Sequence, residues 1–307
     1  MKVFLAGGTG VVGTRALPAL VAAGHEVTAV ARGSEKAALV ERLGGTPVTV
    51  DLFDPGAVAA AVAGHEAVVN LATAIPPLSK ASRPKAWAVN HRLRTEASRH
   101  LVDAALAAGA GRYVQESICF PYLDAGDRWI DEDSPVDHEN PIFASAGAAE
   151  AATARFAEGG GPGVVLRFGQ FYAADAGHTV TMNRLARRRL SPFIGEATAY
   201  MSSIHAEDAG SAVVAALGAP SGIYNVVDDE PVTRAEADEA VAARLGVKPL
   251  RRMPKLVLRL NPSTKAVARS QRVTHDRLTA ATGWTPAHPS IRTSWPTGSD
   301  PAPEASS

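Results

Sequence analysis

Three glycines near the start of the chain have the spacing of a phosphate-binding turn. They lie in the segment KVFLAGGTGVVG at residues 2–13, between a short apolar run and a helical run. A strand that enters a helix through glycines lets backbone N–H groups approach a pyrophosphate at the positive end of the helix, because no side chain blocks the approach. The segment predicts dinucleotide binding, the alternative being a glycine-rich turn that binds nothing. The residues expected to contact the cofactor here are Gly7, Thr9, Gly10, Val11, Val12 and Gly13.

A single arginine follows the second run of β-branched residues. The segment VTAVARGSEK places Ala31 and Arg32 where the strand should give way to a turn. An acidic residue there would bind the ribose hydroxyls of NAD(H), whereas an arginine with no carboxylate at the strand end suits a 2′-phosphate. We therefore expect NADP(H) to be favoured over NAD(H), the alternative being an Arg32 that only faces solvent.

The overall charge argues against two classes of partner. Lysine plus arginine and aspartate plus glutamate both number 31, so no net field attracts nucleic acid or an anionic membrane. The local cluster Arg187–Arg189 is interpreted as a solvated helix end. No stretch approaches the roughly 20 apolar residues of a membrane span. Since the chain enters its first strand at once, we expect no signal peptide and a cytoplasmic protein that acts on a small-molecule substrate.

Metal ligands of the usual kinds are sparse. Cys119 is the only cysteine, so the chain has neither an intrachain disulfide nor a cysteine zinc site. The acidic run Asp131–Asp133 is the one set of residues that resembles a ligand group. Adjacent carboxylates in a turn usually form a solvated face, and we therefore expect no metal.

The elements that must position these residues alternate between strands and helices over the first half of the chain. Short β-branched runs predict strands, and the Ala-rich runs between them predict helices. This alternation indicates an α/β fold, a Rossmann-type doubly wound parallel sheet that binds ligands at the carboxyl ends of its strands. The predicted strands are 27–30, 46–50, 67–72, 112–116 and 163–167, and the predicted helices are 57–63, 89–108 and 144–157.

The alternation loosens in the second half. Residues 168–203 and 231–296 are rich in proline, arginine and aromatic residues, whereas 204–230 indicate a helix and a strand that return to the sheet. We therefore predict a dinucleotide-binding domain of residues 1–167 joined by 204–230, and a smaller C-terminal substrate-binding region of residues 168–203 and 231–296. The Pro/Ser-rich tail 297–307 is predicted to be disordered.

Together these residues resemble the extended short-chain dehydrogenase/reductase family, in its epimerase/dehydratase group. The resemblance extends over residues 1–296. Asp51-Leu52 matches a pair that contacts the adenine in the family, and Asn70-Leu71-Ala72 matches the strand-end segment that lines the cofactor. Asn90 matches a helix asparagine, and Ser117 matches the active-site serine. The resemblance implies further cofactor contacts at Asp51, Leu52, Leu71, Ala72, Thr73 and Asn90.

The catalytic centre departs from the family pattern. The family places a Tyr and a Lys four residues apart at the start of the helix after the fifth strand, where the Tyr moves a proton and the Lys lowers the Tyr pKa. Aligning Glu150 with the family's helix glutamate puts Ile142 at the Tyr position and Ala146 at the Lys position. A shift of one residue gives Phe143 and Gly147. None of the five tyrosines is followed by a lysine four residues later, so the dyad is absent.

Ser117 and Tyr122 are the residues that we expect to handle a proton in its place. Ser117 ends the fifth strand, and Tyr122 lies in the polar loop that follows, where binding residues collect. The alternatives are a hydroxyl that caps the turn and an aromatic ring that packs the loop. Glu116 should point to the opposite strand face unless the strand end bulges. Tyr172 and His205 belong to segments that face the substrate in the family. The predicted substrate contacts are therefore Glu116, Tyr172 and His205, with structural packing as the alternative.

These observations predict an atypical NADP(H)-binding oxidoreductase-like enzyme that transfers hydride to or from a small organic molecule. A non-redox isomerase, lyase or cyclase on the same scaffold is the second hypothesis, and a cofactor-sensing regulator without catalysis is the third. The intact glycine turn argues against a fold that binds nothing, and the lost dyad argues against ordinary dehydrogenase chemistry. For assembly, the resemblance implies a homodimer through the two long helices that flank the sheet.

Overall fold

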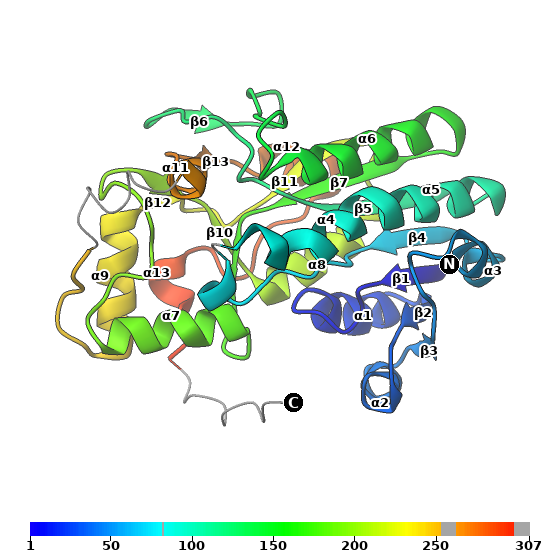
Figure 1. The fold of residues 1–307 in the computed structure, drawn as a ribbon, viewed down its shortest axis with the longest axis horizontal. Coiled ribbons are helices and arrows are strands. Elements are labelled where there is room, and N and C mark those ends of the chain that lie inside the picture. Colours follow the sequence, from blue (N-terminus) through cyan, green and yellow to red (C-terminus); the bar gives the residue numbers. More distant parts are fainter. Residues whose placement is uncertain (82, 253–261, 298–307) are drawn as a thin grey trace.

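A seven-stranded sheet forms the centre of the computed structural model, which describes residues 1–81, 83–252 and 262–297. The strands follow the order β11-β7-β5-β4-β1-β2-β3, and every neighbouring pair is parallel (Figure 1). The predicted Rossmann-type doubly wound sheet is therefore confirmed. Its strands are β1 (Lys2–Ala6), β2 (Glu26–Val30), β3 (Thr46–Val48), β4 (Ala67–Asn70), β5 (Arg112–Ile118), β7 (Gly163–Phe168) and β11 (Gly222–Val226).

Helices cover both faces of the sheet, and each face has its own apolar core. One core contains Leu17, Val40 and Val213, and the other contains Leu101 and Phe156. Alanines at the helix contacts keep both layers close to the strands. The first face carries α1 (Gly13–Ala22), α2 (Ser34–Arg42) and α8 (Ala206–Ala216), and the second carries α3 (Pro55–Val62), α5 (Ser98–Ala107) and α6 (Ala144–Gly159).

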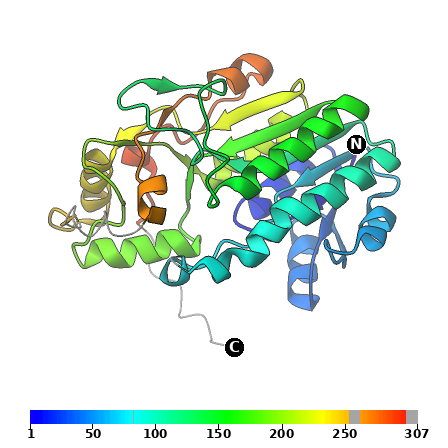
Figure 2. The same cartoon turned by 45° about the horizontal axis from the view of Figure 1, so that its top comes forward.

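One continuous helical segment spans residues 88–107, close to the predicted 89–108. It consists of α4 (Ala88–Arg92), a π-helical turn η3 (Leu93–Ala97) and α5, and it packs beside α6 (Figure 2). Single π-helical turns are frequent at functional sites. Two short 3-10 turns, η1 (Leu78–Lys80) and η2 (Pro84–Trp87), precede the segment.

A second region lies beside the carboxyl ends of the strands (Figures 1 and 2). It has a separate apolar core that includes Tyr172, Met182, Phe193, Val241 and Trp295. Three two-stranded sheets pair β8 with β10, β9 with β12 and β6 with β13. The elements outside the large sheet and its helices are β6 (Trp129–Ile130), β8 (Gln170–Tyr172), α7 (Gly177–Arg187), β9 (Tyr200–Met201), β10 (Ser203–His205), β12 (Val232–Thr233), α9 (Arg234–Leu245), α11 (Pro262–Val267), β13 (Arg272–Val273), α12 (Asp276–Thr282) and α13 (Ile291–Ser294).

Residues 204–230 return to the large sheet. α8 packs against α1, and β11 pairs with β7 at the edge of the sheet. The boundaries of the two predicted domains stay a prediction, and the tail expected at 297–307 lies outside the described residues from position 298 on. In the described part of the chain, no helix combines the length and the apolar character that crossing a membrane requires.

Candidate active site

The glycine turn between β1 and α1 has no room for side chains at two of the three glycines of the predicted phosphate-binding pattern, Gly7, Gly10 and Gly13. Gly7 has a φ of +86°, and a Cβ there would lie 2.5 Å from the backbone carbon of Leu71. A Cβ on Gly13 would lie 2.0 Å from the Gly7 carbonyl oxygen, whereas one on Gly10 would meet that oxygen at 3.4 Å. Backbone therefore packs on backbone here, and no side chain caps the N-terminus of α1. This arrangement leaves the positive end of the helix accessible to an anion.

Two asparagines hold the loop after β4. The Asn70 side chain accepts a hydrogen bond from the Ala72 N–H at 3.1 Å, which turns the chain and ends the strand before the predicted residue 72. Asn90 is buried, and its side-chain oxygen accepts from the Ala74 N–H at 2.9 Å. The predicted cofactor segment 71–73 therefore follows a fixed path beside the glycine turn, and Asn90 acts on this loop through the backbone.

The predicted adenosine end of the site is exposed. Arg32 follows β2 and faces solvent, and no ion pair involves it among the described residues. Asp51 is also exposed and accepts from the Phe53 N–H at 3.0 Å, whereas Leu52 is buried in the core beneath it. The glycine turn, Arg32, Asp51 and segment 71–73 follow four neighbouring strands, so they share one edge of the sheet. A dinucleotide laid along this edge would meet a glycine turn that accepts a pyrophosphate.

Ser117 is buried in a polar network between the sheet and α6. Its Oγ donates to Glu150 Oε1 at 2.7 Å, and Arg167 donates to both oxygens of Glu150, at 2.9 and 2.6 Å. The exposed fractions of Ser117, Glu150 and Arg167 are 0%, 8% and 3%. The Glu150 carboxylate therefore balances the guanidinium away from water, and Ser117 adds a further hydrogen bond to the pair.

Tyr122 joins this network from the loop after β5. Its hydroxyl accepts from Arg167 Nη1 at 2.9 Å and donates to Asn225 Oδ1 at 2.8 Å. The side chain is fully buried, and burial raises the pKa of the hydroxyl. Both hydrogen-bonding functions of the phenol are used inside the protein. That Tyr122 moves a substrate proton stays a prediction, and so does the same role for Ser117.

Glu116 and Ser117 reach the same helical layer although they are neighbours on one strand. Glu116 accepts from Arg94 of η3 at 2.6 and 3.3 Å, in a pair that is buried on both sides. The ladder between β5 and β7 keeps its register through Ile118, and β4 pairs with β5 only as far as Gln115, so Glu116 lies beyond the end of β4, where Arg94 can reach it. Arg94 balances the charge of Glu116, and the predicted contact of Glu116 with a substrate stays a prediction.

The start of α6 offers neither a phenol nor an amine. Ile142 is 36% exposed and Ala146 is buried, at the positions where the resemblance implies Tyr and Lys. In the shifted alignment, Gly147 packs against His138, since a Cβ on Gly147 would lie 2.8 Å from His138 Cγ. His138 Nε2 lies 3.7 Å from Glu150 Oε2. An imidazole therefore occupies the space beside this helix.

Tyr172 and His205 contact each other at the ends of β8 and β10. Their ring centroids are 5.2 Å apart in an edge-to-face arrangement, and Tyr172 also stacks on Trp295. His205 begins α8, where its Nδ1 accepts from the Glu207 N–H at 3.3 Å. Tyr172 belongs to the core of the second region, and His205 is the more accessible of these two predicted substrate contacts.

His205, Asp208 and His288 bring three ligand-type atoms within 4.8 Å of one another. The two imidazoles stack with their centroids 3.8 Å apart and 26° between their planes. An ion bound at about 2 Å from both rings would lie outside both ring planes, where imidazole has no lone pair. The Asp208 carboxylate already accepts three hydrogen bonds from Ala287 and His288. We therefore assign no metal to this cluster.

The structure adds four charged or polar partners to the predicted site, namely Arg94, Glu150, Arg167 and Asn225. Two of them leave a signal in the sequence, because Arg167 ends the apolar run GVVLR and Glu150 interrupts an Ala-rich helix. A charge inside an apolar run needs a partner when it is buried. The sequence does not identify that partner, which lies 17 residues away in this case.

Comparisons with known proteins agree with this geometry. A model of the NAD dependent epimerase/dehydratase family matches residues 3–226. A curated protein from Streptomyces sp, the 3-diazoavenalumate denitrifying reductase, is 37% identical over 304 residues, which cover 95% of this chain and 98% of the relative.

Solved structures of epimerase-type proteins are also similar to this chain. The human epimerase family protein SDR39U1 (isoform 2), solved with NADPH, is 26% identical with a TM-score of 0.79, over 95% of this chain and 97% of that one. The UDP-glucose 4-epimerase of Thermus thermophilus, solved with NAD, is 22% identical with a TM-score of 0.72, again over 95% and 97%. The second likeness concerns the fold alone.

The substitution Glu150→Gln tests the buried pair. It keeps the shape of the side chain but removes the charge that balances Arg167, so we expect the free energy of unfolding to fall by about 3 kcal/mol. Urea denaturation measures this change. Glu96→Gln, which breaks an exposed pair with Arg92, is the matched control and should have no measurable effect. Equal losses in the two variants would contradict the role of the buried pair.

The pH dependence of stability tests the surroundings of His205. Partial burial and the neighbouring His288 hold the pKa of His205 below its usual value of 6.5, while Asp208 and Glu207 oppose the shift. Below that value the unfolded chain binds more protons than the native state, so stability should fall as the pH drops.

In His205→Asn, the amide keeps an acceptor at the helix N-terminus but does not titrate. The decline in the thermal midpoint between about pH 7 and pH 5 should therefore be shallower in this variant. Thermal unfolding followed by circular dichroism at several pH values measures the slope. An identical slope in both proteins would show that His205 does not titrate differently on folding.

Proposed function

The chain belongs to the NAD-dependent epimerase/dehydratase family, and from this premise we propose that it is an NADP(H)-dependent reductase of a small organic molecule. The observation that carries the proposal is a glycine turn shaped for a dinucleotide combined with a helix start that lacks Tyr and Lys. The turn supports cofactor binding. The missing Tyr would have donated a proton to the reduced substrate, so its absence supports a substrate that accepts hydride without a proton from the protein.

The cofactor would be held largely by backbone groups. Gly7 and Gly13 leave the N-terminus of α1 accessible to a pyrophosphate, and segment 71–73 borders the same turn. When bound, a reduced nicotinamide supplies a hydride. Ile142 and Ala146 place only hydrocarbon at the start of α6, so the protein offers no acidic proton at these two positions.

Arg32 supports NADP(H) as the preferred cofactor. Its guanidinium is exposed at the end of β2, and Lys36 adds a second exposed cation in the first turn of α2, where Glu35 is the one nearby carboxylate in sequence. A 2′-phosphate on the adenosine ribose would gain charge-assisted hydrogen bonds from this end of the site. The NADPH bound in the human relative supports the same preference.

The name of the Streptomyces relative supports a diazo group as the acceptor. Reduction of a carbonyl creates an alkoxide that must be protonated, which is the task of the Tyr in the family pattern. In the diazonium form, which we propose as the substrate, the group takes up one hydride, releases dinitrogen and keeps the hydrogen on carbon (R–N₂⁺ + H⁻ → R–H + N₂). Two electrons are transferred and the charges balance without a proton. This reaction requires no proton donor at positions 142 and 146.

The buried hydroxyls of Ser117 and Tyr122 are compatible with such a reaction. Each is already hydrogen-bonded, one to Glu150 and the other to Arg167 and Asn225. In this proposal the two residues position the end of β5 and its loop and deliver no proton.

Isotope transfer tests the proposed function. NADPH labelled with deuterium on either face of C4 is mixed with the protein and a hydroxylated arenediazonium carboxylate. We expect one dinitrogen and one oxidised cofactor per turnover, with deuterium on the aryl carbon. The matching aryl aldehyde, which needs a proton donor, should react at least about a hundredfold more slowly.

Reactions without protein correct for direct reduction of the diazonium group by the cofactor. Saturable binding of NADPH without isotope transfer to either substrate would overturn the reductase proposal and favour a non-redox isomerase, lyase or cyclase. Transfer to the aldehyde at a similar rate would show that another group supplies the proton.

The substitution Arg32→Ala tests the cofactor preference. It should weaken NADPH binding roughly tenfold through loss of the phosphate contact and leave NADH binding unchanged. Titration of nicotinamide fluorescence measures both constants. Arg42→Ala, an exposed position at the other end of α2, is the matched control and should change neither. A loss of affinity for both cofactors would contradict a specific contact with the 2′-phosphate.

A further inference from the structure

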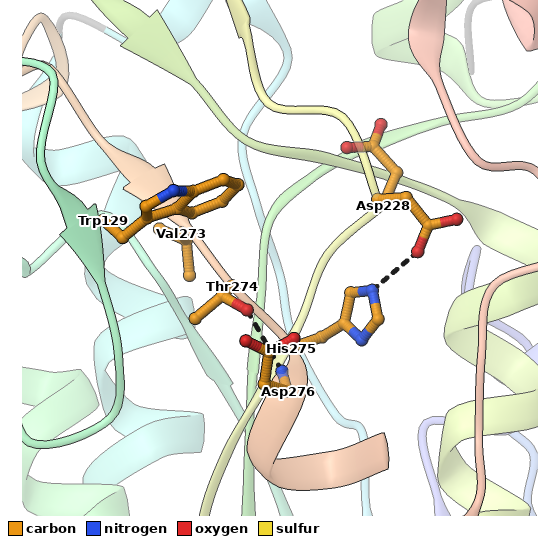
Figure 3. Close-up of a pocket in the computed structure, with 7 residues that line it drawn as sticks. Trp129, Asp228, Val273, Thr274, His275 and Asp276 are labelled. Carbon is orange, nitrogen blue, oxygen red and sulfur yellow. Dashed lines mark hydrogen bonds and ion pairs between the residues drawn. The ribbon is translucent and has the colours of Figure 1, made fainter. Parts of the chain in front are cut away.

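A cavity of about 400 Å³ lies beyond the edge strand β11 (Figure 3). The cavity lies at the carboxyl end of its strand, as the glycine turn does, but strands β7, β5 and β4 separate β11 from β1. Asp228 and Asp229 follow β11, Trp129 comes from β6, Val273 from β13, and Asp276 begins α12. The volume is within the range of sites for small organic molecules.

The walls of this cavity combine carboxylates with an indole. Three aspartates line it, whereas no lysine or arginine does. The Trp129 side chain is 51% exposed, and Figure 3 shows its ring and the Asp228 carboxylate on opposite sides of the space. An anionic group facing an aromatic ring is an arrangement that attracts an organic cation.

Asp228 is the group that indicates a ligand. Its side chain is 1% exposed, and its Oδ2 accepts from Ser203 Oγ at 2.8 Å. Its Oδ1 is buried and has no hydrogen-bond partner in the described part of the chain. A buried acceptor without a donor loses the hydrogen bonds that water would provide. A donor on a bound molecule would satisfy it.

The nearby charged side chains are already engaged elsewhere. Asp229 accepts from His275 Nε2 at 2.8 Å. The guanidinium carbon of Arg272 lies 4.2 Å from the centroid of the Trp129 ring. Arg277 pairs instead with carboxylates of the loop after β6, and Arg292 pairs with Glu230 and Glu236. Two buried donors without a partner, Tyr172 Oη and Arg272 Nε, also belong to the described residues, and Asp228 Oδ1 forms a hydrogen bond with neither of them.

The spacing of the carboxylates favours an organic cation over a metal ion. Among the described residues, the one group that brings three ligand-type atoms within 4.8 Å of one another is His205, Asp208 and His288, which lies outside this cavity. The aspartates of the cavity do not converge in this way. We propose that the cavity binds a small organic molecule through a primary ammonium group that donates to Asp228, with its hydrocarbon part against Trp129 and Val273.

Proton release gives this proposal a signature. Burial raises the pKa of Asp228, and the neighbouring Asp229 and Glu230 add to the shift, whereas hydrogen bonding by Ser203 and by the Ile291 backbone opposes it. An ammonium group stabilises the ionised carboxylate, so its binding should displace a proton from Asp228 and strengthen as the pH rises.

Calorimetric titration with benzylammonium chloride tests the proposal, and benzyl alcohol is the neutral control of matched shape. We expect saturable binding of the ammonium alone, with a heat that depends on the ionisation enthalpy of the buffer. Asp228→Asn should weaken it at least about tenfold. Asp133→Asn, an exposed carboxylate outside the cavity, is the matched control and should leave it unchanged.

Trp129→Ala provides a second variant at an exposed position, in case Asp228→Asn disturbs the fold, and it should weaken binding several-fold. NADPH titration of each variant reports whether the dinucleotide site is intact, independently of this cavity. Equal binding of the alcohol, unchanged affinity in Asp228→Asn and Trp129→Ala, or no saturable binding to the wild type would each overturn the proposal.

Discussion

The ion pair between Glu150 and Arg167 is the interaction on which the centre of the molecule depends. It joins α6 to β7, and through Ser117 and Tyr122 it reaches β5 and the loop that follows. The Tyr122 hydroxyl extends it to Asn225 on β11. A buried charge that loses its counter-charge is strongly destabilising. Each element that meets here is therefore held in place by the same two side chains.

This network separates the architecture of the site from its chemistry. Ala146 lies one helical turn before Glu150, and Ile142 precedes the helix, and neither side chain takes part in the buried pair. The cofactor edge is equally independent, because backbone contacts of Gly7 and Gly13 shape it. The fold can therefore lose a phenol and an amine at the start of α6 and keep both its stability and its dinucleotide turn. In the proposed function, the missing dyad changes only the kind of acceptor that is reduced.

Features that depend on residues close together in the sequence could be predicted, and features that depend on distant partners could not. The glycine turn could be predicted because its glycines lie within one short segment between a strand and a helix, and the sheet could be predicted because its pattern repeats. The hydrogen-bond partners of Tyr122 could not be predicted, since they lie 45 and 103 residues away in the sequence. The ion pair of Glu116 could not be predicted for the same reason, because its partner Arg94 lies 22 residues away in the sequence.

The balanced composition hides a strong local separation of charge. Equal numbers of acidic and basic residues argue against a partner that responds to the whole field of the protein. They say nothing about single sites, where distances of a few ångströms decide the energy. Arg32 follows β2, near one edge of the sheet, and Asp228 follows β11 at the opposite edge. In the two proposals a phosphate binds beyond β2 and an ammonium group binds beyond β11. Both sites lie at the carboxyl ends of parallel strands, and four strands separate β2 from β11.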